Sequence, residues 1–190
     1  ELISEIFYKH FGNPVLGQQS DSAVVPCEGE LLSFTTDSYV VTPVIFNGGN
    51  IGKLAVCGTV NDIAVSGATP KYISSAFIIE EGLSAEELET IVATMAEEAR
   101  KAGVIIATGD TKVVNKGQCD KVFINTAGIG FIKAEHKAIG TGELIRPGDK
   151  ILINGSIADH GMTIMAARNF GNFNTDRKST RLNSSHATLS

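Results

Sequence analysis

Four aspartates occupy positions where a carboxylate needs a cation or a hydrogen-bond donor. Asp37 lies inside an expected strand, Asp62 lies inside a helix of small residues, Asp110 follows a short apolar strand, and Asp21 precedes another strand. Burying an unpaired carboxylate is costly, and two that lie close repel each other by about 4 kcal/mol at an effective dielectric of 20. Oxygen donors select magnesium, calcium or manganese, and magnesium often shares carboxylates with phosphates. Taken together these residues favour a nucleotide site, whereas each aspartate alone is also typical of an edge, turn or loop.

A lysine and a glycine-rich run lie near these acids in sequence. Lys112 follows Asp110 by two residues and is either a phosphate or acyl-group partner or an ordinary surface lysine. The run 48–54 (GGNIGKL) is not a P-loop, because its outer glycines are too close and a leucine follows the lysine where a hydroxyl is needed. The helix start at Ile51 either offers amides to an anion or is a simple glycine turn.

The elements expected to position these residues follow from periodicity and from capping signals. Ser84 with Glu87 forms a capping box, and Gly103 ends the helix behind it. Residues 104–108 are predicted to be a short strand buried on both faces, followed directly by the turn GDTK. Ser156 or Asp159 is expected to cap the last helix. The remaining predictions are helices at 1–11, 51–66 and about 160–170, and strands at 22–26, 31–41, 72–80, 121–132 and 150–154. This order predicts an α/β (α+β layered) domain.

Composition limits the classes of function. Hydrophobic residues make up 43% of the chain and charged residues 19%, as in ordinary globular proteins. A net charge of -5 without a basic tract argues against a nucleic-acid partner, and the apolar runs are too short to cross a membrane. No leader pattern opens the chain, which predicts a cytoplasmic location. Cys27, Cys57 and Cys119 are isolated, so we expect reduced structural thiols.

Several long motifs resemble one protein family. They are the stretch FTTDSYVVTPVIFNGGNIGKLAVCGTVNDIAVSGATPKYISSAFIIEEGL, then TGDTKVV, VFINTAGIG and SIADHG, in order between about residues 15 and 170. This combination resembles the HypE family of hydrogenase maturation proteins. That family belongs to the superfamily of aminoimidazole ribonucleotide synthetase, selenophosphate synthetase and thiamine-phosphate kinase, whose members bind ATP without a P-loop.

The resemblance implies a domain layout. Residues 1–145 would form an N-terminal ATP- and magnesium-binding domain like that of aminoimidazole ribonucleotide synthetase, which dimerises through a shared β-barrel. Residues 146–175 would begin a second, truncated α/β domain. Residues 176–190 have no apolar period and resemble a translated cloning sequence or a disordered tail.

The resemblance also assigns site residues and cofactors. ATP and Mg²⁺ are the implied ligands, with three metal ligands expected at Asp37, Asp62 and Asp110. Lys112 matches the family lysine near the thiocarbamate and is the catalytic candidate. The residues implied to contact the nucleotide are Asp21, Asp37, Asn61, Asp62, Asp110 and Thr111.

The implied reaction is ATP-dependent dehydration of a cysteine-linked thiocarbamate to thiocyanate, for the cyanide ligands of [NiFe] hydrogenase. The implied partners are HypF, the HypC–HypD complex and a second copy of the chain. The glycine-rich N-terminal segment and the C-terminal cysteine typical of the family are absent. We therefore expect that the chain as written does not complete cyanide synthesis.

Two other readings stay open at this point. The chain could be another ATP-using member of the superfamily, such as a thiamine-phosphate kinase or a selenophosphate synthetase. It could also be a non-catalytic module for dimerisation and docking.

Overall fold

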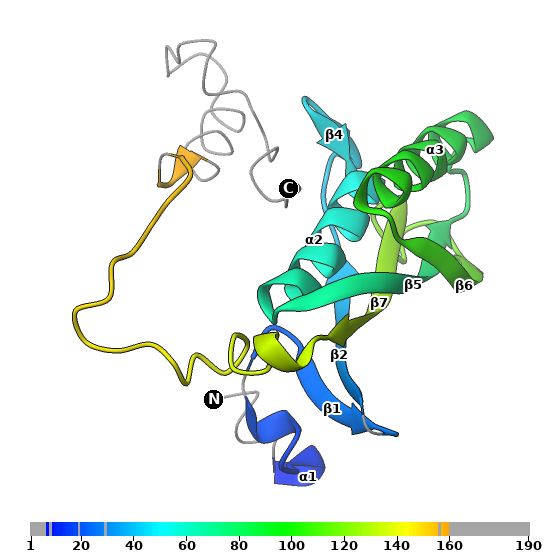
Figure 1. Cartoon of the computed structure of the whole chain (residues 1–190). Coiled ribbons are helices and arrows are strands. Elements are labelled where there is room, and N and C mark those ends of the chain that lie inside the picture. The colour runs from blue at the N-terminus through cyan, green and yellow to red at the C-terminus, as the bar shows by residue number, and fades with distance from the viewer. Residues whose placement is uncertain (1–6, 8, 19, 29, 156, 160–190) are drawn as a thin grey trace.

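Five strands form a single mixed sheet in the computed structural model, which describes residues 7, 9–18, 20–28, 30–155 and 157–159 (Figure 1). The spatial order is β1-β2-β7-β5-β6. Neighbouring strands are antiparallel except β5 and β6, which are parallel and connected through helix α3. The strands are β1 (Ala23–Cys27), β2 (Glu30–Tyr39), β7 (Val122–Ile132), β5 (Ala68–Glu80) and β6 (Ile105–Val114).

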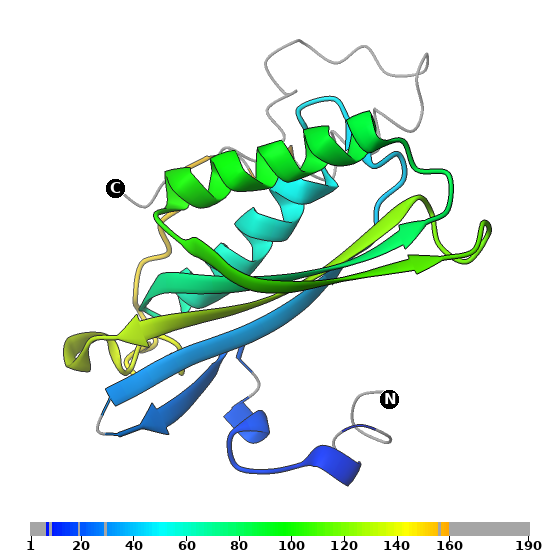
Figure 2. The same ribbon diagram turned by 90° about the vertical axis from the view of Figure 1, so that its right-hand side faces the viewer.

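Both long helices, α2 (Ile51–Val65) and α3 (Ala85–Ala102), cover the same face of this sheet and leave the other face open (Figure 2). The mixed α/β layering predicted from the sequence is therefore confirmed. No helix in the described part of the chain combines the length and the apolarity needed to cross a membrane. The shorter elements are α1 (Lys9–Phe11), η2 (Leu16–Gln18), β3 (Ile45–Phe46), β4 (Gly49–Asn50) and η3 (Ala134–His136).

Small residues let α2 lie close to both α3 and the sheet. A methyl group on Gly52 would come within 2.5 Å of the Ile91 carbonyl oxygen and 2.7 Å of Met95 Cγ. On the sheet side, a methyl group on Gly128 would come within 2.5 Å of Ile63. The core forms where these surfaces meet, and its fully buried side chains include Ile51, Val56, Ile63, Ile73, Ile91, Val122 and Ile124.

The capping signals around α3 work as predicted. The Ser84 hydroxyl accepts a hydrogen bond from the Glu87 amide at 3.1 Å, which satisfies one free donor of the first turn. Gly103 ends the helix in the left-handed conformation with φ of 68°, where glycine costs least.

The prediction for residues 104–108 is wrong in length and in burial. Strand β6 runs from Ile105 to Val114 and lies at the edge of the sheet. Ile105 is 60% exposed because β6 has a neighbour on one side only and its other face is open. The segment Gly109–Lys112 consequently continues the strand instead of forming a turn after it.

The predicted strand at 150–154 is also wrong for the described chain. These residues pair with no strand among those described, and Ile151 is 92% exposed. A strand forms only where a neighbour accepts its backbone hydrogen bonds. Ser156, most of the predicted helix 1–11, the helix at 160–170 and the tail 176–190 lie outside the described residues.

We expect Gly52→Ala to lower the free energy of unfolding by about 1–3 kcal/mol, the usual cost of overpacking a close contact. The added methyl would push α2 away from α3 at the Ile91 carbonyl. Denaturant unfolding measures the change. Gly155→Ala is the matched control, because a methyl group there meets no atom within 4 Å. Equal stability of the two variants would contradict the packing described.

Candidate functional site

Asp62 is the centre of a polar cluster between α2 and strand β2. One of its carboxylate oxygens, Oδ2, accepts a hydrogen bond from the Thr35 hydroxyl at 3.1 Å. The same Thr35 oxygen lies 3.1 Å from the backbone oxygen of Asp21. The Ser22 hydroxyl donates to the backbone oxygen of Asp62, and Ser33 donates to Ser22. Helix, strand and the segment before β1 therefore meet at this carboxylate.

Two further carboxylates act on Asp62. Partial burial raises the pKa of Asp62, the Thr35 hydrogen bond lowers it, and the negative charges of Asp37 and Asp21 raise it again. The only charged groups that shift the pKa of Asp62 among the described residues are the carboxylates of Asp37 and Asp21; no lysine or arginine contributes. Within the described part of the chain, Asp21, Asp37 and Asp62 thus form one negatively charged region that no lysine or arginine neutralises.

Buried hydroxyls line the same region on the side of β7. The Tyr39 hydroxyl lies 3.4 Å from the Thr59 hydroxyl, which contacts that of Thr126. Burial chiefly raises the pKa of Tyr39, and Asp37 and Asp62 raise it further, so this phenol is a neutral donor. Gly58 makes the arrangement possible, because any side chain there would collide with the Tyr39 hydroxyl.

Asp110 does not join this cluster within one chain, which corrects the expectation that Asp37, Asp62 and Asp110 converge. Asp37 pairs with Thr126 on β7, and Thr126 pairs with Ser75 on β5. Ser75 in turn pairs with Gly109 on β6, beside Asp110. Three strand spacings amount to about 14 Å.

The face of the sheet separates them as well. Asp110 pairs with Ala76, which pairs with the exposed Asn125, so Asp110 points to the open face. Lys112 lies on this face too, whereas Thr111 points to the helix side at the edge. The reason is the register of a parallel edge strand, which sequence motifs do not encode.

Two other predicted positions lie on α2. Asn61 is partly buried beside Asp62. At the helix start, the Asn50 side chain accepts the Lys53 amide at 3.1 Å. This contact caps the helix and favours the glycine-turn reading of the run 48–54 over an anion site.

Among the described residues, no group of three His, Cys, Asp or Glu side chains is placed to hold one metal ion. The oxygen donors of Asp37 and Asp62 nevertheless fit Mg²⁺, which commonly uses one or two carboxylates and takes its other ligands from water and phosphates. A cavity of about 560 Å³ lies elsewhere, lined by Thr42, Glu80, Lys121 and their neighbours, and includes none of the predicted site residues.

The residues that sequence reasoning missed are hydroxyls. Ser33, Thr35 and Tyr39 alternate with exposed residues along β2 and share the helix-facing side with Asp37. A strand whose buried face is mostly polar is unusual. That alternation in LLSFTTDSY was the available signal for a polar site on this face.

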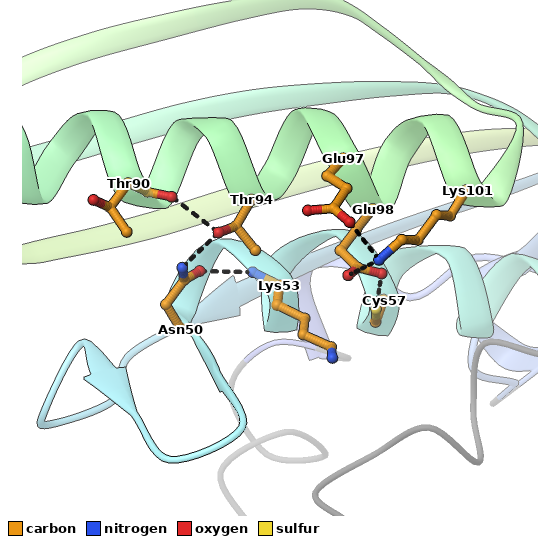
Figure 3. A network of polar contacts seen from close by, with 8 residues as sticks. All are labelled: Asn50, Lys53, Cys57, Thr90, Thr94, Glu97, Glu98 and Lys101. Carbon is orange, nitrogen blue, oxygen red and sulfur yellow. Dashed lines mark hydrogen bonds and ion pairs between the residues drawn. The ribbon is translucent and has the colours of Figure 1, made fainter.

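A second polar network joins α2 to α3 (Figure 3). Lys101 lies 2.8 Å from Glu97 and 3.1 Å from Glu98, and the Cys57 sulfur lies 4.0 Å from Glu98. Burial and the nearby Glu98 charge raise the pKa of Cys57. All three cysteines are free. Cys57 is therefore a packed thiol and a poor nucleophile at neutral pH.

Comparison with known proteins defines the class to which this fold and site belong. Residues 19–132 match the family described as AIR synthase related protein, N-terminal domain. The match covers more than half of the chain, and the chain belongs to this family.

Within the family the chain is similar to HypE proteins. It is 52% identical to carbamoyl dehydratase HypE of Escherichia coli (strain K12) over 174 residues, covering 88% of this chain and 51% of that protein. The resemblance expected from the motifs is thus confirmed. The chain spans about half the length of the curated relatives it matches.

Solved structures agree. The crystal structure of a HypE–HypF complex matches with a TM-score of 0.81 and 48% identity, over 92% of this chain and 55% of that one. The crystal structure of HypE in complex with ATP matches with a TM-score of 0.70 and 53% identity, and the match covers 92% of this chain and 51% of that one.

We expect Cys27 to react with iodoacetamide before Cys57 and Cys119 at neutral pH. Cys27 is exposed, whereas burial raises the pKa of the other two thiols and leaves fewer reactive thiolates. Peptide mass spectrometry over a time course measures the order. In urea, where burial is lost, all three should react at similar rates. Faster reaction of Cys57 in the folded chain would contradict its packed environment.

Proposed function

We propose that this chain binds ATP with Mg²⁺ and forms the N-terminal part of an ATP-dependent carbamoyl dehydratase of hydrogenase maturation. The observation that carries the proposal is the unneutralised region around Asp62, with Asp37 and Asp21 acting on it. Carboxylates that repel one another gain stability from a divalent cation, and a nucleotide supplies the oxygen ligands they lack. The similarity to a HypE structure in complex with ATP supports the same ligand.

In the proposed reaction, the thiocarbamate oxygen of a cysteine-linked S–C(=O)–NH₂ group attacks the γ-phosphoryl group of ATP, and ADP leaves. The carbon–oxygen bond then breaks, phosphate departs, and the nitrogen loses two protons to give S–C≡N. Asp37 and Asp62 would hold the Mg²⁺, which neutralises charge on the transferred phosphoryl group. Lys112 would stabilise the departing phosphate as an ammonium ion. The acceptor cysteine is none of Cys27, Cys57 and Cys119.

A second copy of the chain would complete this site. The open face of the sheet carries apolar side chains that a soluble monomer seldom exposes as one patch. Phe34 and Tyr72 are each 46% exposed there, and Ile105 is 60% exposed. Asp110 and Lys112 lie on the same face. Pairing two open faces would bury the patch and place Asp110 and Lys112 at the interface. A nucleotide held by Asp37 and Asp62 on the helix side of one sheet would then have to extend past the edge of that sheet to meet Asp110 and Lys112 of the other chain.

The partners follow from the relatives. We propose that HypF docks on this protein, as it does on the similar chain of the HypE–HypF complex, and that the HypC–HypD complex receives the product. Free cysteines fit a reducing cytoplasm. The 52% sequence identity to a HypE protein favours this activity over phosphate transfer to thiamine phosphate or selenophosphate synthesis.

We expect isothermal calorimetry to detect Mg–ATP binding, and Asp62→Asn to weaken it by about 100-fold, because a carboxylate ligand of the cation is lost. Glu89→Gln removes one exposed acid from α3 and is the matched control. Wild-type chain that gives no heat with Mg–ATP would contradict the function. Equal affinities of the two variants would remove Asp62 from the site.

We expect Tyr72→Glu to convert a two-chain assembly into single chains, because a charge would be buried where the open faces meet. Analytical ultracentrifugation measures the change. Val92→Glu places the same charge on the exposed side of α3 and should leave the assembly intact. A wild-type chain that sediments as a monomer at all concentrations would contradict the proposed pairing.

A further inference from the structure

One hydroxyl group joins two of the acidic segments. Thr35 is 7% exposed, and its Oγ1 lies 3.1 Å from both Asp62 Oδ2 and the backbone oxygen of Asp21. A hydroxyl has a single hydrogen to donate. At any moment the Thr35 hydroxyl therefore donates either to the Asp62 carboxylate on α2 or to the Asp21 backbone oxygen before β1. Both contacts fix the position of the hydroxyl.

Close packing holds this hydroxyl in place. Thr35 pairs with Gly128 on β7. A methyl group at Gly128 would come within 2.5 Å of Ile63 and 2.6 Å of Thr59, so the glycine lets α2 approach the sheet at this point. Asp62 lies in the same turn of α2 as these two residues. Its side chain thus reaches β2 only because the neighbouring strand carries no side chain.

The contact leaves one carboxylate oxygen available. Within the described part of the chain, Oδ2 of Asp62 has the Thr35 hydroxyl as its partner, and Oδ1 has no hydrogen-bond donor. A carboxylate fixed through one oxygen turns the other in a defined direction. Hydrogen bonds of this kind orient metal ligands in many sites.

We propose that Thr35 is a positioning residue for cation-bound nucleotide, holding Asp62 by one oxygen so that the other meets the cation. The inference rests on the proposed binding of Mg–ATP. Thr35 touches neither the nucleotide nor the cation. It acts through Asp62, and its methyl group contributes only to packing.

Two substitutions separate the hydroxyl from the shape of the side chain. Thr35→Val keeps the shape and removes the donor, whereas Thr35→Ser keeps the donor. Thr36→Val is the control, because Thr36 neighbours Thr35 but lies on the exposed side of β2, where its hydroxyl donates to the Thr126 carbonyl. Calorimetry with Mg–ATP gives affinities, and thermal unfolding without ligand shows that each variant folds.

We expect Thr35→Val to weaken Mg–ATP binding by about 10-fold, the usual effect of removing the partner of a metal ligand. Thr35→Ser and Thr36→Val should stay within about 3-fold of wild type, since each keeps the Thr35 donor. If Thr35→Val fails to fold, Thr35→Ala takes its place in the same comparison.

The inference is overturned if the folded variant without the hydroxyl binds as tightly as wild type, or if Thr35→Ser is as weak as Thr35→Val. Either result would assign Thr35 to packing alone. Failure of the wild-type chain to bind Mg–ATP is a different outcome, because it would refute the proposed function itself and the inference with it.

Discussion

The close approach of α2 to the sheet is the constraint on which the rest of the structure depends. Glycines at 58 and 128 remove the side chains that would hold the helix away. Asp62 can then contact Thr35 and lie within electrostatic reach of Asp37 and Asp21. Hydrogen bonds from hydroxyl groups offset part of the repulsion between the carboxylates. A bound cation would relieve the repulsion that remains. The same packing that builds the core therefore creates an incomplete binding site.

Much of the fold could be predicted because its signals are local. The Ser84 capping box, the Gly103 end of α3 and the many β-branched and aromatic residues of β7 are each signals that lie within a few residues. The predictions failed where the outcome depends on neighbours distant in sequence. Residues 104–108 looked buried because they are apolar, but residues 105–108 are exposed because β6 lies at the edge of the sheet. The segment 150–154 is apolar without a strand beside it in the described chain.

For the site, too, the sequence could predict individual residues but not how the sheet arranges them. Motifs singled out Asp21, Asp37 and Asp62, which the structure brings together. They could not show that Asp110 and Lys112 point to the opposite face, because strand order and register are properties of the whole sheet. Thr35 escaped notice because threonine in a strand is ordinary, and only its position two residues before Asp37, on the same buried side of β2, marks it. The separation of the acids by face and by distance is what makes a second copy necessary to the account.

Mixing two inactive variants tests that account most directly. Chains with Asp62→Asn and chains with Asp110→Asn are each expected to lose Mg–ATP binding when measured alone. After the two are unfolded and refolded together, random pairing makes about half of the dimers mixed, and each mixed dimer has one site with both acids intact. We predict that about a quarter of the wild-type binding capacity returns on mixing. A mixture that binds no more than its separate components would mean that both acids serve a site within one chain, which the arrangement of the sheet contradicts.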